Sequence, residues 1–134
     1  MTELQVGVKI LVKNDGGKYL LLKRSAEKYP EVGERWDIVG GRIDAGIPLI
    51  ENLRREVMEE TGLVIENEPV LVAAQDILRI EGRHIVRLTY VGYANGNPVL
   101  TDEHTEYGWF TVEEMKGMDL DIYFKEVLDK WVVD

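Results

Sequence analysis

The sequence predicts an α/β protein that forms a single domain, and three observations lead to this prediction. The chain has 134 residues, of which 45% are apolar, enough for one hydrophobic core and too few for two ordinary ones. Short apolar runs that end in Asn, Asp or Gly recur along it, as is typical of strands joined by turns. Two longer segments place apolar residues at helical spacing. We therefore expect one domain over residues 1–134.

The predicted strands cover residues 5–12, 18–24, 36–39, 70–80, 85–94 and 107–110. The first two flank an Asn-Asp-Gly-Gly turn and are expected to form a hairpin, because these turn residues adopt conformations that others resist. The fourth and fifth are expected to form a second, longer hairpin around an intervening Glu-Gly-Arg. Residues 25–35 contain Pro and Gly without periodicity, which predicts a surface loop of the kind that often lines a ligand site.

Three helices are predicted. Residues 48–61 form the first, with proline tolerated in its opening turn and Gly62 placed to end it. Thr111 and Glu114 have the spacing of a capping box, which predicts a short helix after the last strand. Residues 122–132 have the apolar spacing of an amphipathic helix.

The composition excludes several kinds of partner and site. The chain has 16 basic and 25 acidic residues, and its formal net charge of −9 argues against binding to a nucleic-acid polymer. It has no cysteine, so a metal must be held by oxygen atoms or by His84 and His104. The first apolar run has charged residues on both sides, and no run reaches membrane-spanning length. These features predict a cytoplasmic protein with no membrane partner.

The most informative segment is the predicted helix at 48–61. At about 100° per residue, Glu59 and Glu60 fall within roughly 60° of Glu56, so three carboxylates share one face. An apolar stripe on the neighbouring face is expected to dock the helix on a sheet. Like charges at these spacings destabilise an isolated helix, and a divalent cation between them would relieve the repulsion. Ligands that are all oxygen atoms favour Mg²⁺ or Mn²⁺.

A pair of glutamates alone would favour a plainer interpretation, in which they form solvated helix surface and Glu51 pairs with Arg55. The surrounding sequence favours the chemical interpretation, because a Gly-Gly step follows a strand and leads through a turn into the helix and a closing Thr-Gly. This combination resembles the signature of the Nudix hydrolases, G-x5-E-x7-R-E-U-x-E-E-x-G-U, in which U is aliphatic. Within the box at 41–63, the matching positions are Gly41, Arg55, Glu56, Val57, Glu59, Glu60, Gly62 and Leu63.

The resemblance implies a Nudix-type α/β/α sandwich with a mixed β-sheet between helices. It also implies a metal-dependent hydrolase in which water attacks a diphosphate that joins a nucleoside to another group. The implied cofactor is Mg²⁺ or Mn²⁺, the implied partner is a small nucleotide substrate, and a homodimer is left open. A nucleoside triphosphate is the expected substrate of so short a MutT-like chain, with 8-oxo-dGTP among the candidates. Cleavage of ADP-ribose or a nucleotide sugar, and a nucleotide-binding module of low activity, are the alternatives.

The family pattern assigns roles to the residues of the box. It implies that Glu56 and Glu60 are metal ligands, with the backbone carbonyl of Gly40 as an additional one. Glu59 is implied as a third ligand or as the base that holds the attacking water. Arg55 is expected to orient these carboxylates rather than to touch the substrate.

Outside the box, Glu103 is the expected acid from a loop across the site, with Glu106 second. Arg24 and Arg35 flank the loop before the Gly-Gly step and are candidates for phosphate binding, with solvated surface charge an equal alternative. Four further aromatic and imidazole side chains are expected to be structural or incidental, namely Trp36, Trp109, His84 and His104.

The sequence departs from the family pattern at position 47, where Ile47 replaces a glutamate. In the family, that glutamate supports the arginine of the R-E step and the charge balance around the metals. Isoleucine does neither. Glu51 lies four residues before Arg55 and is the candidate to take over the orienting pair, so we expect reduced rather than abolished activity.

Overall fold

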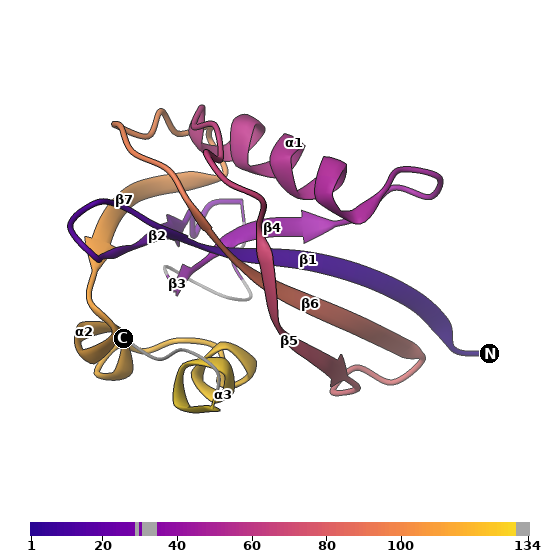
Figure 1. The fold of residues 1–134 in the computed structure, drawn as a ribbon. Coiled ribbons are helices and arrows are strands. Elements are labelled where there is room, and N and C mark those ends of the chain that lie inside the picture. Colours follow the sequence, from indigo (N-terminus) through magenta and orange to yellow (C-terminus); the bar gives the residue numbers. More distant parts are fainter. Residues whose placement is uncertain (29, 31–34, 131–134) are drawn as a thin grey trace.

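The computed structural model describes residues 1–28, 30 and 35–130 of the chain, and Figure 1 shows their arrangement. The strands are β1 (Glu3–Lys13), β2 (Tyr19–Arg24), β3 (Trp36–Asp37), β4 (Val39–Arg42), β5 (Val70–Ile77), β6 (Arg83–Tyr93) and β7 (His104–Phe110). The helices are α1 (Leu49–Thr61), α2 (Val112–Lys116) and α3 (Ile122–Lys130). None of the helices in this part of the chain has the length and apolar character that a bilayer crossing requires.

The strands form one mixed sheet in which β1 is the central element. The sheet order is β3-β2-β1-β6-β5, with β4 also paired to β1 and β7 to β2. β1 runs parallel to β6 over its whole length, from Glu3 opposite Arg83 to Lys13 opposite Tyr93. Its other edge is paired with the antiparallel strand β4.

Two hydrophobic cores cover the two faces of this sheet, because successive side chains of a strand point to opposite faces. Val8 and Ile10 of β1 pack with α1 residues in one core, whereas Leu11 packs with residues of α2 and α3 in the other. Figure 1 accordingly shows α1 on one side of the sheet and the two short helices on the other. This layering confirms the predicted α/β/α sandwich with a mixed sheet.

The first predicted hairpin is correct only at its turn. β1 and β2 are antiparallel, and their register contains the single pair Lys13 with Tyr19. Beyond that point β1 is paired with β4 and β6, while β2 pairs with β3 and β7. The strand predicted at 107–110 begins earlier, at His104, because its pairing with β2 extends that far. The second predicted hairpin is confirmed, although β5 ends at Ile77.

The predicted helix ends agree closely with the structure. α1 begins after Pro48 and ends at Gly62, whose φ of 73° lies in the left-handed region that glycine adopts without strain. The capping box is present at α2, where Thr111 and Glu114 each accept a hydrogen bond from the other's backbone N–H. α3 is described as far as Lys130, so the last two residues of the helix predicted at 122–132 lie outside the described residues.

Candidate active site

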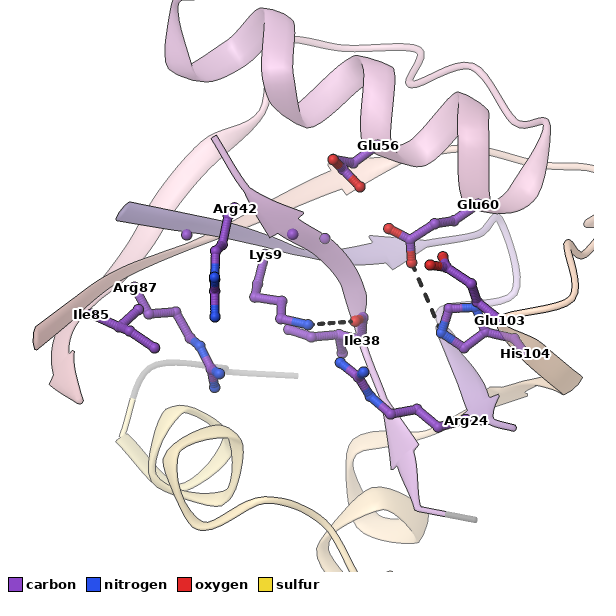
Figure 2. Close-up of a pocket in the computed structure, with 13 residues that line it drawn as sticks. Lys9, Arg24, Ile38, Arg42, Glu56, Glu60, Ile85, Arg87, Glu103 and His104 are labelled. Atoms are coloured by element: carbon purple, nitrogen blue, oxygen red, sulfur yellow. Dashed lines mark hydrogen bonds and ion pairs between the residues drawn. The ribbon is translucent and has the colours of Figure 1, made fainter. Parts of the chain in front are cut away.

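A pocket of about 370 Å³ opens where β4 passes the C-terminal half of α1. Its charged lining falls into two groups that come from different elements (Figure 2). The carboxylates are those of Glu56 and Glu60 on α1 and of Glu103, which immediately precedes β7. The cations are Lys9, Arg24, Arg42 and Arg87, each from a different strand of the sheet. The pocket therefore offers one region for cations and another for anions.

The position of the α1 carboxylates follows from the way the helix docks. Leu53 and Val57 are fully buried in the core between α1 and the sheet. Glu60 lies at the edge of this buried stripe and is itself only 7% exposed, whereas the Glu59 side chain is 60% exposed. Of the three carboxylates predicted to share a face, Glu56 and Glu60 line the pocket and Glu59 lies outside the lining, toward solvent.

Glu60 is the most strongly perturbed acid of the pocket. Burial, together with the hydrogen bond and negative charge of Glu56 and the charge of Glu103, raises its pKa to about 8, and Lys9 opposes the shift. His104 approaches the same carboxylate, with Nε2 4.0 Å from Oε1 of Glu60. A buried carboxylate surrounded by other carboxylates is stabilised by a bound cation.

His104 is part of this pocket, although sequence reasoning classed it as incidental. It is the first residue of β7, is buried and lines the pocket beside Glu103. Burial and the nearby charge of Arg24 lower its pKa, and its Nδ1 is a buried atom without a hydrogen-bond partner among the described residues. The signal that could have located it is the pairing of the last strand with β2, which places His104 opposite Arg24.

The two glycines of β4 allow the helix, β4 and β1 to approach closely. Gly40 has a φ of 148°, and a Cβ on it would lie 2.1 Å from the carbonyl oxygen of Val8. A Cβ on Gly41 would lie 3.0 Å from Oε2 of Glu56. Both glycines line the pocket; a side chain at Gly40 would collide with β1, and one at Gly41 would occupy space next to the Glu56 carboxylate.

Arg55 is held in a network outside the pocket. Its guanidinium donates a hydrogen bond of 2.7 Å to Asp44 and one of 3.0 Å to Asn52, and it lies 3.6 Å from both Glu56 and Glu59. The hydrogen bond to Asp44 is the main cause of a raised pKa for Arg55. Asp44 therefore takes the role expected of Glu51, which forms no ion pair with Arg55 in the described structure. The reason is that the turn before α1 places the backbone N–H of Asp44 3.1 Å from Oδ1 of Asn52 in the first turn of the helix, so the Asp44 carboxylate lies next to Arg55.

Lys9 and Arg24 share one counter-ion, Asp37, whose side chain is 15% exposed. The Oδ2 atom of Asp37 lies 3.1 Å from Nζ of Lys9 and 3.2 Å from Nη2 of Arg24. Although burial opposes ionisation, the two cations and Arg87 lower the pKa of Asp37 to about 2. The carboxylate is thus ionised and fixes two cations of the pocket in place.

Sequence reasoning missed three of the four cations in the pocket, Lys9, Arg42 and Arg87. Lys9 gave a signal, because it interrupts a run of apolar residues in a central strand, where a charge requires a partner. Arg42 and Arg87 lie on β4 and β6, and the face of the sheet to which their side chains point depends on the register of these strands with β1. They therefore gave no local signal.

Of the two arginines that were predicted to bind phosphate, only Arg24 lines the pocket in the described structure. The backbone carbonyl of Arg35 accepts a hydrogen bond of 3.0 Å from the N–H of Arg24. Glu106, the second choice for the acid across the site, lies on β7 and forms a 3.6 Å ion pair with Lys23. Glu103 is the one of the two predicted acids that faces α1 in the pocket.

Trp36, Trp109 and His84 are held by structural contacts. Trp36 and Trp109 are partly buried and pack against the two cores, as expected. His84 lies 2.7 Å from Asp76 on the neighbouring strand and is not among the residues that line the pocket.

Comparison with known proteins identifies the family. The profile described as NUDIX domain matches residues 3–131. The chain belongs to the NUDIX domain family. It is therefore a Nudix hydrolase, a pyrophosphohydrolase whose box at 41–63 contributes Glu56 and Glu60 to the pocket.

Relatives and solved structures agree with this assignment. A nucleoside triphosphatase, NudI, of Salmonella agona is 30% identical over 128 residues, which span 88% of this chain and 89% of the relative. A Mycobacterium tuberculosis protein named provisionally as 8-oxo-dGTP diphosphatase 2 is 31% identical over 90 residues, or 67% of this chain and 63% of the relative. The crystal structure of the MutT protein from Methanosarcina mazei superposes with a TM-score of 0.85 at 28% identity, covering 96% of this chain and 93% of that one.

Nudix hydrolases generally use divalent metal ions, and the Nudix pocket has the chemistry for one. Its acids supply oxygen ligands, and burial together with the carboxylates of Glu56 and Glu103 raises the pKa of Glu60, so a cation bound here would stabilise its ionised form. In the described residues, no three acidic or histidine side chains are arranged to hold an ion by themselves. Mg²⁺ usually takes one or two carboxylates and completes its shell with water and substrate phosphates, so two carboxylates of α1 fit such an ion.

Proposed function

We propose that this Nudix hydrolase cleaves nucleoside triphosphates with Mg²⁺ or Mn²⁺ as its cofactor, in the manner of MutT-like enzymes, with 8-oxo-dGTP among the candidate substrates. The observation that carries the proposal is the division of the pocket into carboxylates and cations. A triphosphate bound with a divalent ion presents both a cation and free anionic oxygen atoms, so it complements both regions. The names of the NudI and MutT relatives support the same substrate class.

Glu56 and Glu60 are the proposed side-chain ligands of the ion, with the Gly40 carbonyl beside them in the pocket lining. When bound, the ion neutralises charge on the phosphate oxygens and makes a coordinated water more acidic. Glu59 is the third carboxylate of the proposal and would reach the ion or the attacking water from the solvent side. The Arg55 guanidinium lies 3.6 Å from the carboxylates of both Glu59 and Glu56. We propose that Arg55 orients the two carboxylates through these contacts.

Glu103 is proposed as the acid across the site. It lines the pocket opposite α1 and is one of the charges that raise the pKa of Glu60. In this position it would accept the proton of the water that attacks phosphorus, while the bond from phosphorus to the bridging oxygen breaks. Arg24 and Lys9 are fixed by Asp37 and would stabilise the negative charge on the phosphates. Arg24 carries this part of the proposal rather than Arg35 because Arg24 lines the pocket.

A panel of nucleotides tests the proposal. The protein is incubated with Mg²⁺ and with nucleoside triphosphates, 8-oxo-dGTP, ADP-ribose or a nucleotide sugar, and release of phosphate, pyrophosphate and nucleoside monophosphate is measured. We expect hydrolysis of triphosphates. Preferential cleavage of ADP-ribose or a nucleotide sugar would show that these compounds, and not nucleoside triphosphates, are the substrates. Tight binding without turnover would identify a low-activity nucleotide-binding module.

Two substitutions on α1 test the metal assignment. Glu60→Gln removes a proposed ligand, and we expect it to abolish most of the turnover and to weaken Mg²⁺ binding measured by titration calorimetry. Glu51→Gln is the matched control, because it removes the same charge from an exposed position of the same helix. Unaltered turnover in Glu60→Gln would contradict the assignment.

A further inference from the structure

Arg87 lies at the end of the pocket away from the carboxylates. It is on β6, opposite Gly7 of the parallel strand β1, and both residues line the pocket. The nearest atom to a Cβ built on Gly7 would be the carbonyl oxygen of Gly41, at 3.8 Å, so the pocket is not crowded at this strand position. Figure 2 shows Arg87 and Arg42 on one side of the pocket and Glu60 on the other.

The carboxylate of Asp121 holds Arg87 from outside the pocket. Asp121 lies immediately before α3, and its Oδ2 is 3.3 Å from Nη1 of Arg87. The same carboxylate accepts a hydrogen bond of 3.1 Å from the backbone N–H of Tyr123 and one of 2.6 Å from Arg79. The Asp121 side chain is only 12% exposed, so its charge is weakly screened by solvent. The start of α3 therefore restricts the orientation of a pocket cation.

The contact with Asp121 leaves most of the Arg87 donors unused. A guanidinium carries five N–H donors. Within the described residues, Arg87 donates one hydrogen bond, which goes to Asp121. The side chain is 16% exposed and faces the pocket. A donor group that is already oriented loses little entropy when a ligand binds, which makes it effective in recognition.

We propose that Arg87 is a specificity-determining residue that donates hydrogen bonds to oxygen atoms of the nucleotide, and that Asp121 is the residue that positions it. This inference rests on the function proposed above. The acceptor oxygen atoms belong to a phosphate group or to a carbonyl of the base, since a guanidinium binds either through its paired donors. Because Arg87 is remote from the carboxylates, its contribution falls on substrate binding rather than on the chemical step.

Steady-state kinetics of three variants test the proposal. Arg87→Gln should raise KM about tenfold or more with kcat nearly unchanged, since hydrogen bonds to charged groups are the strong ones. Asp121→Asn should raise KM in the same direction by a smaller factor, because asparagine keeps the helix cap but loses the charge. Arg79→Gln is the matched control, since Arg79 binds the same carboxylate and is not in the pocket lining; its KM should equal that of the wild type.

The double variant separates positioning from a merely structural role. Asp121→Asn added to Arg87→Gln should raise KM no further, because the positioning residue acts only through the arginine. Arg87→Lys should recover part of the affinity, since it restores the charge without the paired donors. Thermal unfolding of each variant shows whether a change in KM is accompanied by a loss of folded protein.

Two measurements on Arg87→Gln identify the oxygen atoms of the nucleotide that accept its hydrogen bonds. If Arg87→Gln weakens competitive inhibition by inorganic triphosphate, the acceptors are phosphate oxygens. If it leaves that inhibition intact and reduces the difference in KM between GTP and ATP, the acceptor is a base carbonyl. Either result supports the proposal. Hydrolysis by the wild type with an unchanged KM in both Arg87→Gln and Asp121→Asn would overturn it, whereas absence of nucleotide hydrolysis in the wild type would overturn the proposed function instead.

Discussion

Arg55 donates a 2.7 Å hydrogen bond to Asp44, a residue of the turn that precedes α1. Asn52 supports this pair, because its Oδ1 accepts hydrogen bonds from both the Arg55 side chain and the Asp44 backbone N–H. The box of this chain lacks the glutamate of the family pattern, and Ile47 at that position is 39% exposed. A carboxylate three residues earlier in the sequence thus contacts the arginine that lies beside Glu56 and Glu59.

Asp44→Asn should lower kcat/KM by roughly two- to fivefold, the range expected for loss of an exposed ion pair. Arg55 would keep its contacts with Asn52, Glu56 and Glu59 and lose its strongest restraint. Initial rates on the best triphosphate of the panel provide the measurement. Glu68→Gln is the control, because Glu68 forms an exposed ion pair with Arg54 and neither residue is in the pocket lining. Equal rates in the two variants would show that Asp44 does not orient the site.

Ile47→Glu should increase turnover or Mg²⁺ affinity, because it restores a carboxylate to the box near the start of α1. The measurement is a set of initial rates over a range of Mg²⁺ concentrations, for the variant and the wild type. Ile47→Gln adds a polar group of similar size without the charge and serves as the control. The expectation of reduced activity in the natural sequence would be wrong if both metal affinity and turnover were the same in Ile47→Glu as in the wild type.

Gly41→Ala should impair activity more than stability. The added methyl group would lie 3.0 Å from Oε2 of Glu56, so the carboxylate has to move by a few tenths of an ångström. Displacing a proposed metal ligand should lower kcat/KM about tenfold or more, because catalysis depends on close positioning. Gly117→Ala is the control, since its Cβ would meet only the Glu114 carbonyl at 3.6 Å. Wild-type kinetics in Gly41→Ala would contradict the proposed role of Glu56.

Leu53→Ala should destabilise the fold by about 2–5 kcal/mol, because it leaves a cavity between α1 and the sheet. Leu53 is fully buried, whereas Met58 on the same helix is 48% exposed. Met58→Ala should change the free energy of unfolding by less than about 0.5 kcal/mol. Urea unfolding followed by circular dichroism gives both values. Similar values for the two variants would show that the apolar stripe does not anchor the helix.

Asp37 should make stability depend on pH below about 4. Its pKa is about 2 in the folded protein, against 3.8 for an unperturbed aspartate. A carboxyl group whose pKa is lowered on folding contributes its full stabilisation above the unfolded value, and loses it as the pH falls through the folded one. This contribution is about 2 kcal/mol at neutral pH.

The measurement for Asp37 is urea unfolding between pH 2 and pH 7. Asp37→Asn should be less stable than the wild type at pH 7, because Lys9 and Arg24 lose their shared counter-ion. The difference between the two proteins should shrink as the pH falls from 4 to 2. A difference that stays constant over this range would show that Asp37 is not the titrating group.

Much of the fold could be predicted because it depends on neighbouring residues. Gly62 ends α1 in the left-handed conformation, and Thr111 with Glu114 caps α2, each through contacts within one turn. The helical wheel of α1 likewise placed Glu56, Glu59 and Glu60 on one face, because helical geometry fixes that relation locally. Sequence alone therefore determined both ends of α1, the start of α2 and the second hairpin, and it placed the pocket carboxylates Glu56 and Glu60 on one helix face together with Glu59.

The tertiary structure decided which charges meet these carboxylates. Arg87 faces the pocket because β6 runs parallel to β1 with Arg87 opposite Gly7, and a shift of one residue would turn its side chain to the other face. The choice of Asp44 over Glu51 as the partner of Arg55 depends on the path of the turn before α1, and the place of His104 depends on the pairing of β7 with β2. Strand register and turn path depend on the packing of residues far apart in the chain. For that reason local patterns predicted the carboxylates and Arg24, and only the folded sheet showed the other three cations, Lys9, Arg42 and Arg87.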